Sequence, residues 1–200
     1  MEQLTLFDLE RRFGVQAASN SGFFLEWQQA LTPLTPEERS RLLRVEAAYA
    51  NLERRSRLEN TVKLAVVAPL LDLAGLFLPP FYVTTEKTVE ITTEDADVTR
   101  RGRLDIWVLK DQLWVLVIES KRAEFSLKVG IPQVLGYMLA APQTDCPLYG
   151  MVTNGGSFVF LKLLQSGTPR YARSKELILD QDDGLGQTLQ ILKALAVAIS

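Results

Sequence analysis

The chain has 200 residues, a formal net charge of −2 and hydrophobic residues at 47% of its positions, a composition typical of one globular domain. The sequence contains no histidine, which excludes Ser-His-Asp and Cys-His catalysis and His-ligated zinc. With one cysteine, no apolar run of about 20 residues and no signal-peptide pattern, the sequence predicts a cytoplasmic protein that does not enter a membrane.

The first part of the chain is predicted to be helical. Residues 23–31 fit a short helix. Thr35-Pro36-Glu37-Glu38 predicts the start of a longer one, because Thr at the N-cap, Pro at N1 and Glu at N3 form a capping box. That helix is expected to run to about Ser56. A further helical pattern covers residues 58–73, where Pro69 predicts a kink.

Strand patterns dominate the middle of the chain. Residues 82–93 are rich in Thr and Val and predict a strand, which the polar stretch 94–101 is expected to connect to the next one. Two short apolar runs, 104–109 and 113–118, predict a β-hairpin. Both faces of the second run are apolar, so this strand is expected inside the sheet with helices above and below it.

Helix and strand patterns alternate in the last part of the chain: a helix at 128–141, strands at 147–153 and 158–164 joined by Asn154-Gly155-Gly156, and a helix at 187–199 that covers the sheet. The order of elements predicts an α/β sandwich around one mixed sheet. We expect residues 1–56 to form an N-terminal helical extension and residues 57–200 a single compact domain.

The buried hairpin contains three charged residues, Asp105, Glu119 and Lys121, although charged side chains are rarely buried without a partner or a metal. With a three-residue loop at 110–112, Asp105 lies opposite Val117 and diagonal to Glu119, about 7–8 Å apart by Cα. A two-residue loop would move the two acids to opposite faces unless a bulge intervenes. The sequence therefore predicts that both carboxylates share one site.

The chemistry of this group points to a hard cation. Two carboxylates and the backbone carbonyl of Ser120 fit a Mg²⁺ or Mn²⁺ site completed by water. Lys121, two positions after Glu119, would orient or help to deprotonate a bound water. These are the requirements of metal-assisted phosphodiester hydrolysis.

Asp105 followed by Glu119-Ser120-Lys121 resembles the PD-(D/E)XK nuclease superfamily, over roughly residues 58–163. Leu104 stands where the name-giving proline would be, and members often lack that proline. Gln133 and Tyr137 match the QxxxY motif of RecB-like nucleases and type I restriction-subunit nuclease domains. Glu59 matches an additional metal-binding acid found in some members.

The resemblance implies a restriction-endonuclease-like fold and a Mg²⁺- or Mn²⁺-dependent nuclease acting on DNA, alone, as a homodimer or within a larger assembly. The residues implied are catalytic Asp105, Glu119, Lys121 and Gln133, supporting Glu59, Tyr137 and Arg103, metal-binding Asp105, Glu119, Ser120 and Glu59, and phosphate-contacting Arg100, Arg101, Arg122 and Lys128. We expect Asp105→Ala to abolish cleavage and to keep or raise thermal stability, because it removes repulsion between carboxylates.

Other interpretations compete with these. The charged hairpin residues would also fit a structural ion pair, Glu59 and the basic residues a solvated surface, and the whole fold a non-catalytic module that binds nucleic acid or protein. DNA and RNA, and endo- and exonuclease action, stay alternatives. Cys146 is expected to be a small buried residue, and Trp107 and Trp114 to pack in the core.

Overall fold

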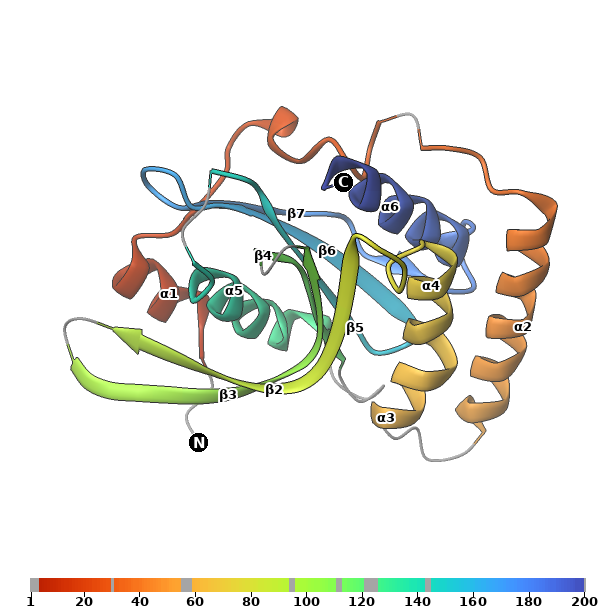
Figure 1. Cartoon of the computed structure of the whole chain (residues 1–200), viewed down its shortest axis with the longest axis horizontal. Coiled ribbons are helices and arrows are strands. Elements are labelled where there is room, and N and C mark those ends of the chain that lie inside the picture. The colour runs from red at the N-terminus through yellow and green to blue at the C-terminus, as the bar shows by residue number, and fades with distance from the viewer. Residues whose placement is uncertain are drawn as a thin grey trace.

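A computed structural model describes most of the chain (Figure 1). The described residues are 4–29, 31–54, 59–93, 96–110, 113–120, 126–142 and 145–199. The backbone alone is described for Glu53, Glu59, Glu119, Ser120 and residues 86–93, 96–104 and 113–117. No helix among the described residues is long and apolar enough to cross a membrane.

The described strands form one eight-stranded mixed sheet in the order β1-β7-β6-β5-β4-β3-β2, with β8 paired to β6. The pairs β4–β5 and β1–β7 are parallel, and the other pairs are antiparallel. The strands are β1 (Gln16–Ala17), β2 (Phe81–Thr93), β3 (Ala96–Lys110), β4 (Leu113–Ser120), β5 (Leu148–Thr153), β6 (Ser157–Leu164), β7 (Arg170–Arg173) and β8 (Leu177–Ile178).

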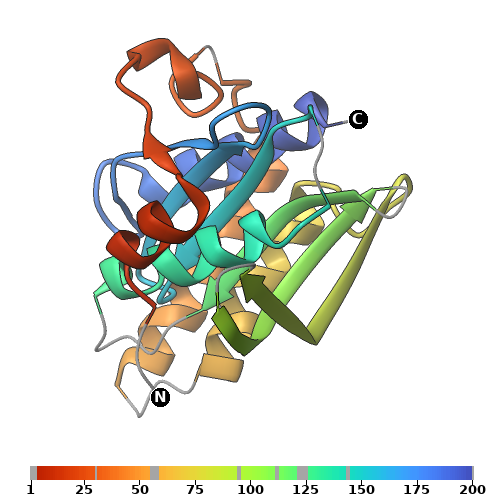
Figure 2. The ribbon, with the colours of Figure 1, turned by 90° about the vertical axis from the view of Figure 1, so that its left-hand side faces the viewer.

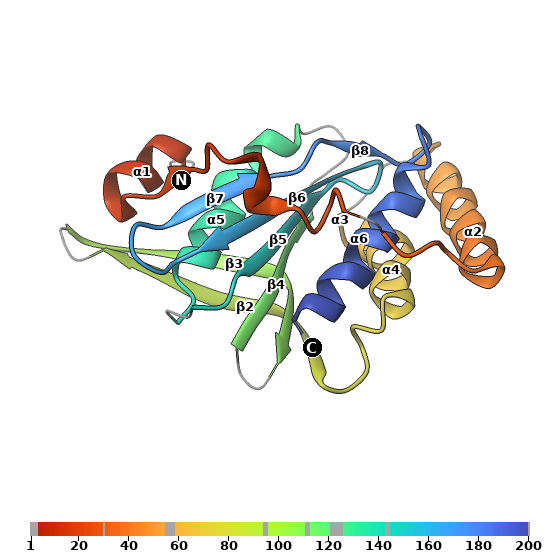
Figure 3. The same cartoon turned by 90° about the horizontal axis from the view of Figure 1, so that it is seen from above.

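Helices cover both faces of this sheet. On one face lie α2 (Pro36–Glu53), the π-helix η2 (Lys63–Val67), α4 (Ala68–Leu73) and α6 (Gly184–Ala198), and Figure 3 shows α6 beside α4 with α2 outside them. On the other face lie α1 (Leu6–Phe13) and α5 (Ile131–Leu139), which Figure 2 shows side by side. Short helical turns form α3 (Glu59–Val62), η1 (Ser21–Phe24) and η3 (Leu127–Val129). The predicted α/β sandwich around a mixed sheet is confirmed.

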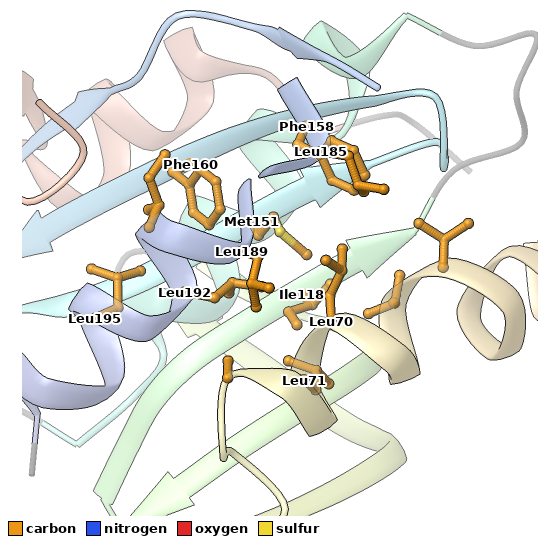
Figure 4. Close-up of a cluster of buried hydrophobic side chains, with 14 of the residues drawn as sticks. Leu70, Leu71, Ile118, Met151, Phe158, Phe160, Leu185, Leu189, Leu192 and Leu195 are labelled. Atoms are coloured by element: carbon orange, nitrogen blue, oxygen red, sulfur yellow. The ribbon is translucent and has the colours of Figure 1, made fainter. Parts of the chain in front are cut away.

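Each face of the sheet has its own hydrophobic core. In the α4–α6 core, Leu70 of α4, Ile118 of β4 and Leu192 of α6 are completely buried (Figure 4). In the α5 core, Trp107 of β3 packs with Tyr137 of α5 and other apolar residues. Burial of these two layers on opposite faces is the main favourable contribution to folding, and the prediction that Trp107 packs in the core is confirmed.

Residues before position 57 contribute to the same core as the sheet. Phe24, Leu42, Val45 and Tyr49 are buried in the α4–α6 core. Lys193 of α6 also forms an ion pair with Glu38 at 2.5 Å. The division of the chain at residues 56 and 57 stays a prediction, but the first helices share a core with the sheet.

The predicted start of the helix α2 and the predicted turn between β5 and β6 are confirmed. The capping box of α2 is present, with Glu38 N–H donating to Thr35 Oγ1 at 3.2 Å and Thr35 N–H donating to Glu38 Oε2 at 2.7 Å. Between β5 and β6, Asn154 Oδ1 accepts from the backbone N–H groups of Gly156 and Ser157. Gly155 has a φ of 86°, a conformation that favours glycine.

Three predictions about local structure are wrong. Residues 96–101 do not form a polar connection, because they continue β3 and pair with β2 as far as Thr93 and Ala96. This two-stranded ribbon extends beyond the rest of the sheet (Figure 1), and its polar sequence lacks the alternating apolar pattern that predicts a strand. The helix expected at 23–31 is the short turn η1, and Cys146 is exposed. The elements α1, β1, β7 and β8 were not predicted.

The helical pattern at 58–73 is one helix with an irregular centre. The backbone N–H of Ala68 donates to the carbonyl of Lys63, five residues earlier, as in a π-helix. Pro69 follows directly and has no N–H of its own to continue the α-helical ladder. A widened turn therefore lies just before Pro69, and such turns often occur at functional sites; the kink at Pro69 stays a prediction.

Candidate functional site

The register between β3 and β4 decides where the two predicted acids lie. Near the turn, Lys110 pairs with Leu113, so two residues and not three lie between the strands. A bulge between Val108 and Leu109 then shifts the register, after which Ile106 pairs with Ile118. The predicted register, with Asp105 opposite Val117, is therefore wrong.

The bulge restores the relation that the shorter turn would have removed. One further step along both strands from the Ile106–Ile118 pair places Asp105 opposite Glu119. The extra residue on β4 thus returns both acidic positions to one face of the hairpin.

Asp105 lies at the point where the two strands separate. The Ile106–Ile118 pair is the last one recorded between β3 and β4, and β3 continues toward its N-terminus in partnership with β2 alone. On the other side, the β2–β3 register places the backbone of Glu86 opposite Asp105, between the printed pairs Thr85–Ile106 and Lys87–Leu104. Three acidic positions, Glu86, Asp105 and Glu119, are therefore aligned across three neighbouring strands.

The side chain of Asp105 is buried and bound by a lysine. Lys63 Nζ donates to Asp105 Oδ1 at 2.5 Å, and the two side chains are 14% and 11% exposed. Lys63 is the first residue of the π-helix, on the helices of the α4–α6 face. Trp107, two residues after Asp105 on β3, packs on the opposite, α5 face of the sheet. The ion pair between Lys63 and Asp105 thus connects the helices of the α4–α6 face to the point where β3 leaves β4.

Gln133 and Tyr137 lie together on α5. Gln133 Nε2 donates to the Tyr137 hydroxyl at 2.9 Å. Tyr137 is almost completely buried in the α5 core, whereas Gln133 is partly exposed. Gly150 of β5 allows α5 to approach the sheet, since a Cβ on this residue would lie 2.5 Å from Cγ1 of Val134.

Several predicted residues lie partly or wholly outside the described structure. Lys121 and Arg122 lie outside the described residues. The backbone but not the side chain is described for Glu59 in α3, Arg100, Arg101 and Arg103 in β3, and Glu119 and Ser120 at the end of β4. Lys128 is exposed in η3. The assigned roles of all these residues stay predictions.

The donors of the predicted metal site are described only in part. Asp105 supplies a buried carboxylate that already binds one cationic group, the Lys63 amine. Glu119 is opposite it, and Ser120 ends β4 with its backbone paired to Thr153 of β5. Among the described side chains, no three acidic or cysteine residues form a metal-binding group; the side chains of Glu59, Glu86 and Glu119 are not among those described.

Sequence reasoning missed two positions of this site. Lys63 is the one charged residue in the otherwise apolar run from Val62 to Leu71, and this charge in an apolar stretch is the signal that could have found it. Glu86 is an unremarkable acid in a Thr-rich strand. Its alignment with Asp105 follows only from the pairing of β2 with β3.

A second polar cluster lies away from the predicted site. Glu26 Oε1 accepts from the Tyr149 hydroxyl at 2.8 Å and from Lys162 Nζ at 2.5 Å. Burial raises the pKa of Glu26, but the hydrogen bonds from Lys162 and Tyr149 outweigh this effect and hold the pKa below its usual value. Burial and the bond to Glu26 raise the pKa of Tyr149. This cluster attaches the N-terminal segment to β5 and β6.

Comparisons with known proteins give weak matches of structure. No family model and no curated protein sequence matches the chain. One similar solved structure is a DrdV–DNA complex, with a TM-score of 0.48, 19% identity, and coverage of 76% of this chain and 14% of that one. Another is a fragment of a putative HsdR subunit of a type I restriction enzyme from Vibrio vulnificus YJ016, with a TM-score of 0.40, 18% identity, and coverage of 58% and 23%. This chain thus spans less than a quarter of each of these two chains.

Proposed function

We propose that this chain is a metal-dependent phosphodiesterase that hydrolyses DNA, with a restriction-endonuclease-like site. The observation that carries the proposal is the register of β3 and β4, which ends at the Ile106–Ile118 pair and, continued by one residue, brings the backbone positions of Asp105 and Glu119 to face each other. The predicted order of helix, three strands, helix and strand supports it, since α4, β2, β3, β4, α5 and β5 follow one another in that order.

Each residue of the site has a proposed task. Asp105, Glu119 and the backbone carbonyl of Ser120 would hold Mg²⁺ or Mn²⁺, with Glu59 as a further ligand. When bound, the metal ion supplies Lewis acidity at a phosphate oxygen and activates a water molecule. Lys63 holds the Asp105 carboxylate in place. Lys121 would accept or orient a proton of the attacking water.

The helix α5 and the surrounding basic residues would support this chemistry. Gln133, held by Tyr137, is positioned to orient a polar group of the substrate or site. Arg100 and Arg101 belong to the ribbon formed by β2 and β3, and a two-stranded ribbon fits the major groove of DNA. These two residues, with Arg103, Arg122 and Lys128, are the proposed phosphate contacts.

A non-catalytic module that binds nucleic acid or protein is the second candidate. It is favoured by the ion pair between Lys63 and Asp105, because this acid has a cationic partner supplied by the protein itself. In this case the acidic row would be a structural feature, and divalent metal would neither bind nor stabilise the chain.

A cleavage assay separates the two candidates. Supercoiled, linear and single-stranded DNA are incubated with Mg²⁺ or Mn²⁺ and wild-type protein, Asp105→Asn or Asp145→Asn. Asp145 is an exposed aspartate outside the site and serves as the matched control. The proposal expects metal-dependent cutting by the wild type and the control, its loss in Asp105→Asn, and a metal-induced rise in melting temperature that Asp105→Asn lacks.

The opposite results would favour the binding module. They are no cutting of any substrate with either metal, together with an unchanged melting temperature on addition of metal.

Cutting of both DNA strands by one site per chain commonly uses two copies of the chain. Light scattering with and without DNA therefore tests the proposed homodimer, for which a mass of one chain in both conditions would be evidence against.

A further inference from the structure

An open pocket of about 390 Å³ borders Asp105. One wall is the helical segment from α3 to α4, which contributes Leu71, and the other wall is formed by β2 and β3, which contribute Val83 and Ile106. Leu71 and Ile106 are buried. Phe77, from the segment between α4 and β2, also lines the pocket.

The lining of this pocket is mostly apolar, although the ion pair of Lys63 and Asp105 borders it. Phe77 and Leu64 are 46% and 75% exposed, so two large apolar side chains face solvent at its edge. The polar lining residues are Asn60 and Lys63 on the helical wall and Thr85 and Asp105 on the strand wall. A pocket of this size that combines mostly apolar walls with a few polar groups is typical of a binding site for a small organic group.

We infer that this pocket receives an unpaired nucleobase of the substrate strand, an inference that rests on the proposed function. Asp105 belongs both to the proposed phosphodiester site and to the pocket, so a nucleotide with its phosphate at Asp105 has its base within reach of the pocket. Exposed Phe77 provides a face on which a base stacks, and Leu64 an apolar edge. Asn60 and Thr85 provide hydrogen-bonding groups for the edge of the base.

The substrate class follows from this geometry. A base inside a duplex is stacked and paired, and it reaches such a pocket only after it has left the helix. Single-stranded DNA, or a strand end with an unpaired terminal base, avoids this unstacking cost. The pocket therefore predicts a preference for unpaired over fully paired DNA, both in binding and in the position of cutting.

Fluorescence anisotropy in EDTA tests the pocket without metal or catalysis. Three labelled probes are compared at one salt concentration: a single-stranded oligonucleotide, its duplex, and a strand of the same length made of abasic sites. The wild type is expected to bind the single strand more tightly than either other probe. Phe77→Ala should weaken single-strand binding at least about fivefold, the lower end of the contribution of one stacked base.

The matched control is Phe7→Ala, which removes an exposed phenylalanine of α1 on the other face of the molecule. It should leave binding of all three probes unchanged, and melting temperatures check that both variants are folded. Equal affinities of Phe77→Ala and Phe7→Ala for the single strand, or equal binding of the intact and abasic strands by the wild type, would overturn the inference.

The test also separates this inference from the proposed function. Metal-dependent cutting that is lost in Asp105→Asn, without any effect of Phe77→Ala on binding or strand preference, would overturn the pocket and keep the nuclease. Weaker single-strand binding by Phe77→Ala, without cutting of any DNA, would keep the pocket as a base-binding site and overturn the nuclease.

Discussion

Removal of the Asp105 carboxylate is expected to destabilise the protein, contrary to the expectation from the sequence alone. That expectation considered repulsion between neighbouring acids. In the structure, Lys63 Nζ lies 2.5 Å from Asp105 Oδ1, and both side chains are nearly buried. Asp105→Ala would leave the lysine charge buried without this carboxylate, and breaking a buried pair in this way typically costs about 3–5 kcal/mol.

The residual exposure of the pair places the expected cost at the lower end, about 3 kcal/mol. For a chain of this length, each kcal/mol lowers Tm by roughly 2–4 °C, which predicts a decrease of about 6–12 °C. Lys63→Met should cost a similar amount. The double variant Lys63→Met/Asp105→Ala should cost clearly less than the sum of the two single changes, because removing both charges leaves neither of them buried without its partner.

Thermal and urea unfolding in EDTA measure these effects without any contribution from metal. Asp145→Ala, a change at an exposed aspartate, is the control and should unfold like the wild type. The reasoning would be refuted if Asp105→Ala melted at or above the wild-type temperature. It would also be refuted if the two single changes added to within about 0.5 kcal/mol in the double variant.

Three further changes test the supports of the site and of the N-terminal segment. Gly150→Ala should destabilise by about 1–3 kcal/mol in urea unfolding, because its Cβ would overlap Val134 on α5, and an unchanged midpoint would contradict this packing. Tyr137→Phe should cost about 1 kcal/mol, since it removes a buried hydroxyl that is hydrogen-bonded within α5; stability equal to the wild type would show that this bond contributes nothing. The ion pair of Glu26 with Lys162 lowers the pKa of Glu26, so its stabilisation is present above the unfolded-state pKa of 4.5 and is lost as pH falls through the lower folded-state value. Unfolding of Glu26→Gln from pH 7 to pH 3 should therefore approach the wild type at the acidic end, and a difference that grows on acidification would contradict the assignment.

Elements with a strong local signal were predicted well. The start of α2 is encoded by four consecutive residues from Thr35, and the β5–β6 turn by Asn154 and the two glycines that follow it. The helix at 187–199 is present as α6. These signals depend on hydrogen bonds between residues a few positions apart, so they need no knowledge of the rest of the chain.

Elements whose stability comes from distant partners were missed. β7 is four residues long and pairs with both β6 and β1, and β8 consists of two residues paired with β6. Such short strands have too few positions to show an alternating pattern. The extension of β3 to Ala96 was missed for a related reason, since its pairing with β2 is made by backbone hydrogen bonds that leave no signal in the side-chain pattern.

The sequence by itself determined the chemical character of the candidate site: no histidine, two acids in neighbouring strands, and an alternation that permits them to share a face. Only the tertiary structure decided the rest. A two-residue turn would have separated the acids, and the bulge between Val108 and Leu109 returned them to the same face. The partner of Asp105, Lys63, is 42 residues away in sequence. Register and long-range pairing depend on which strands and helices pack together, a property of the whole folded chain that no local pattern encodes.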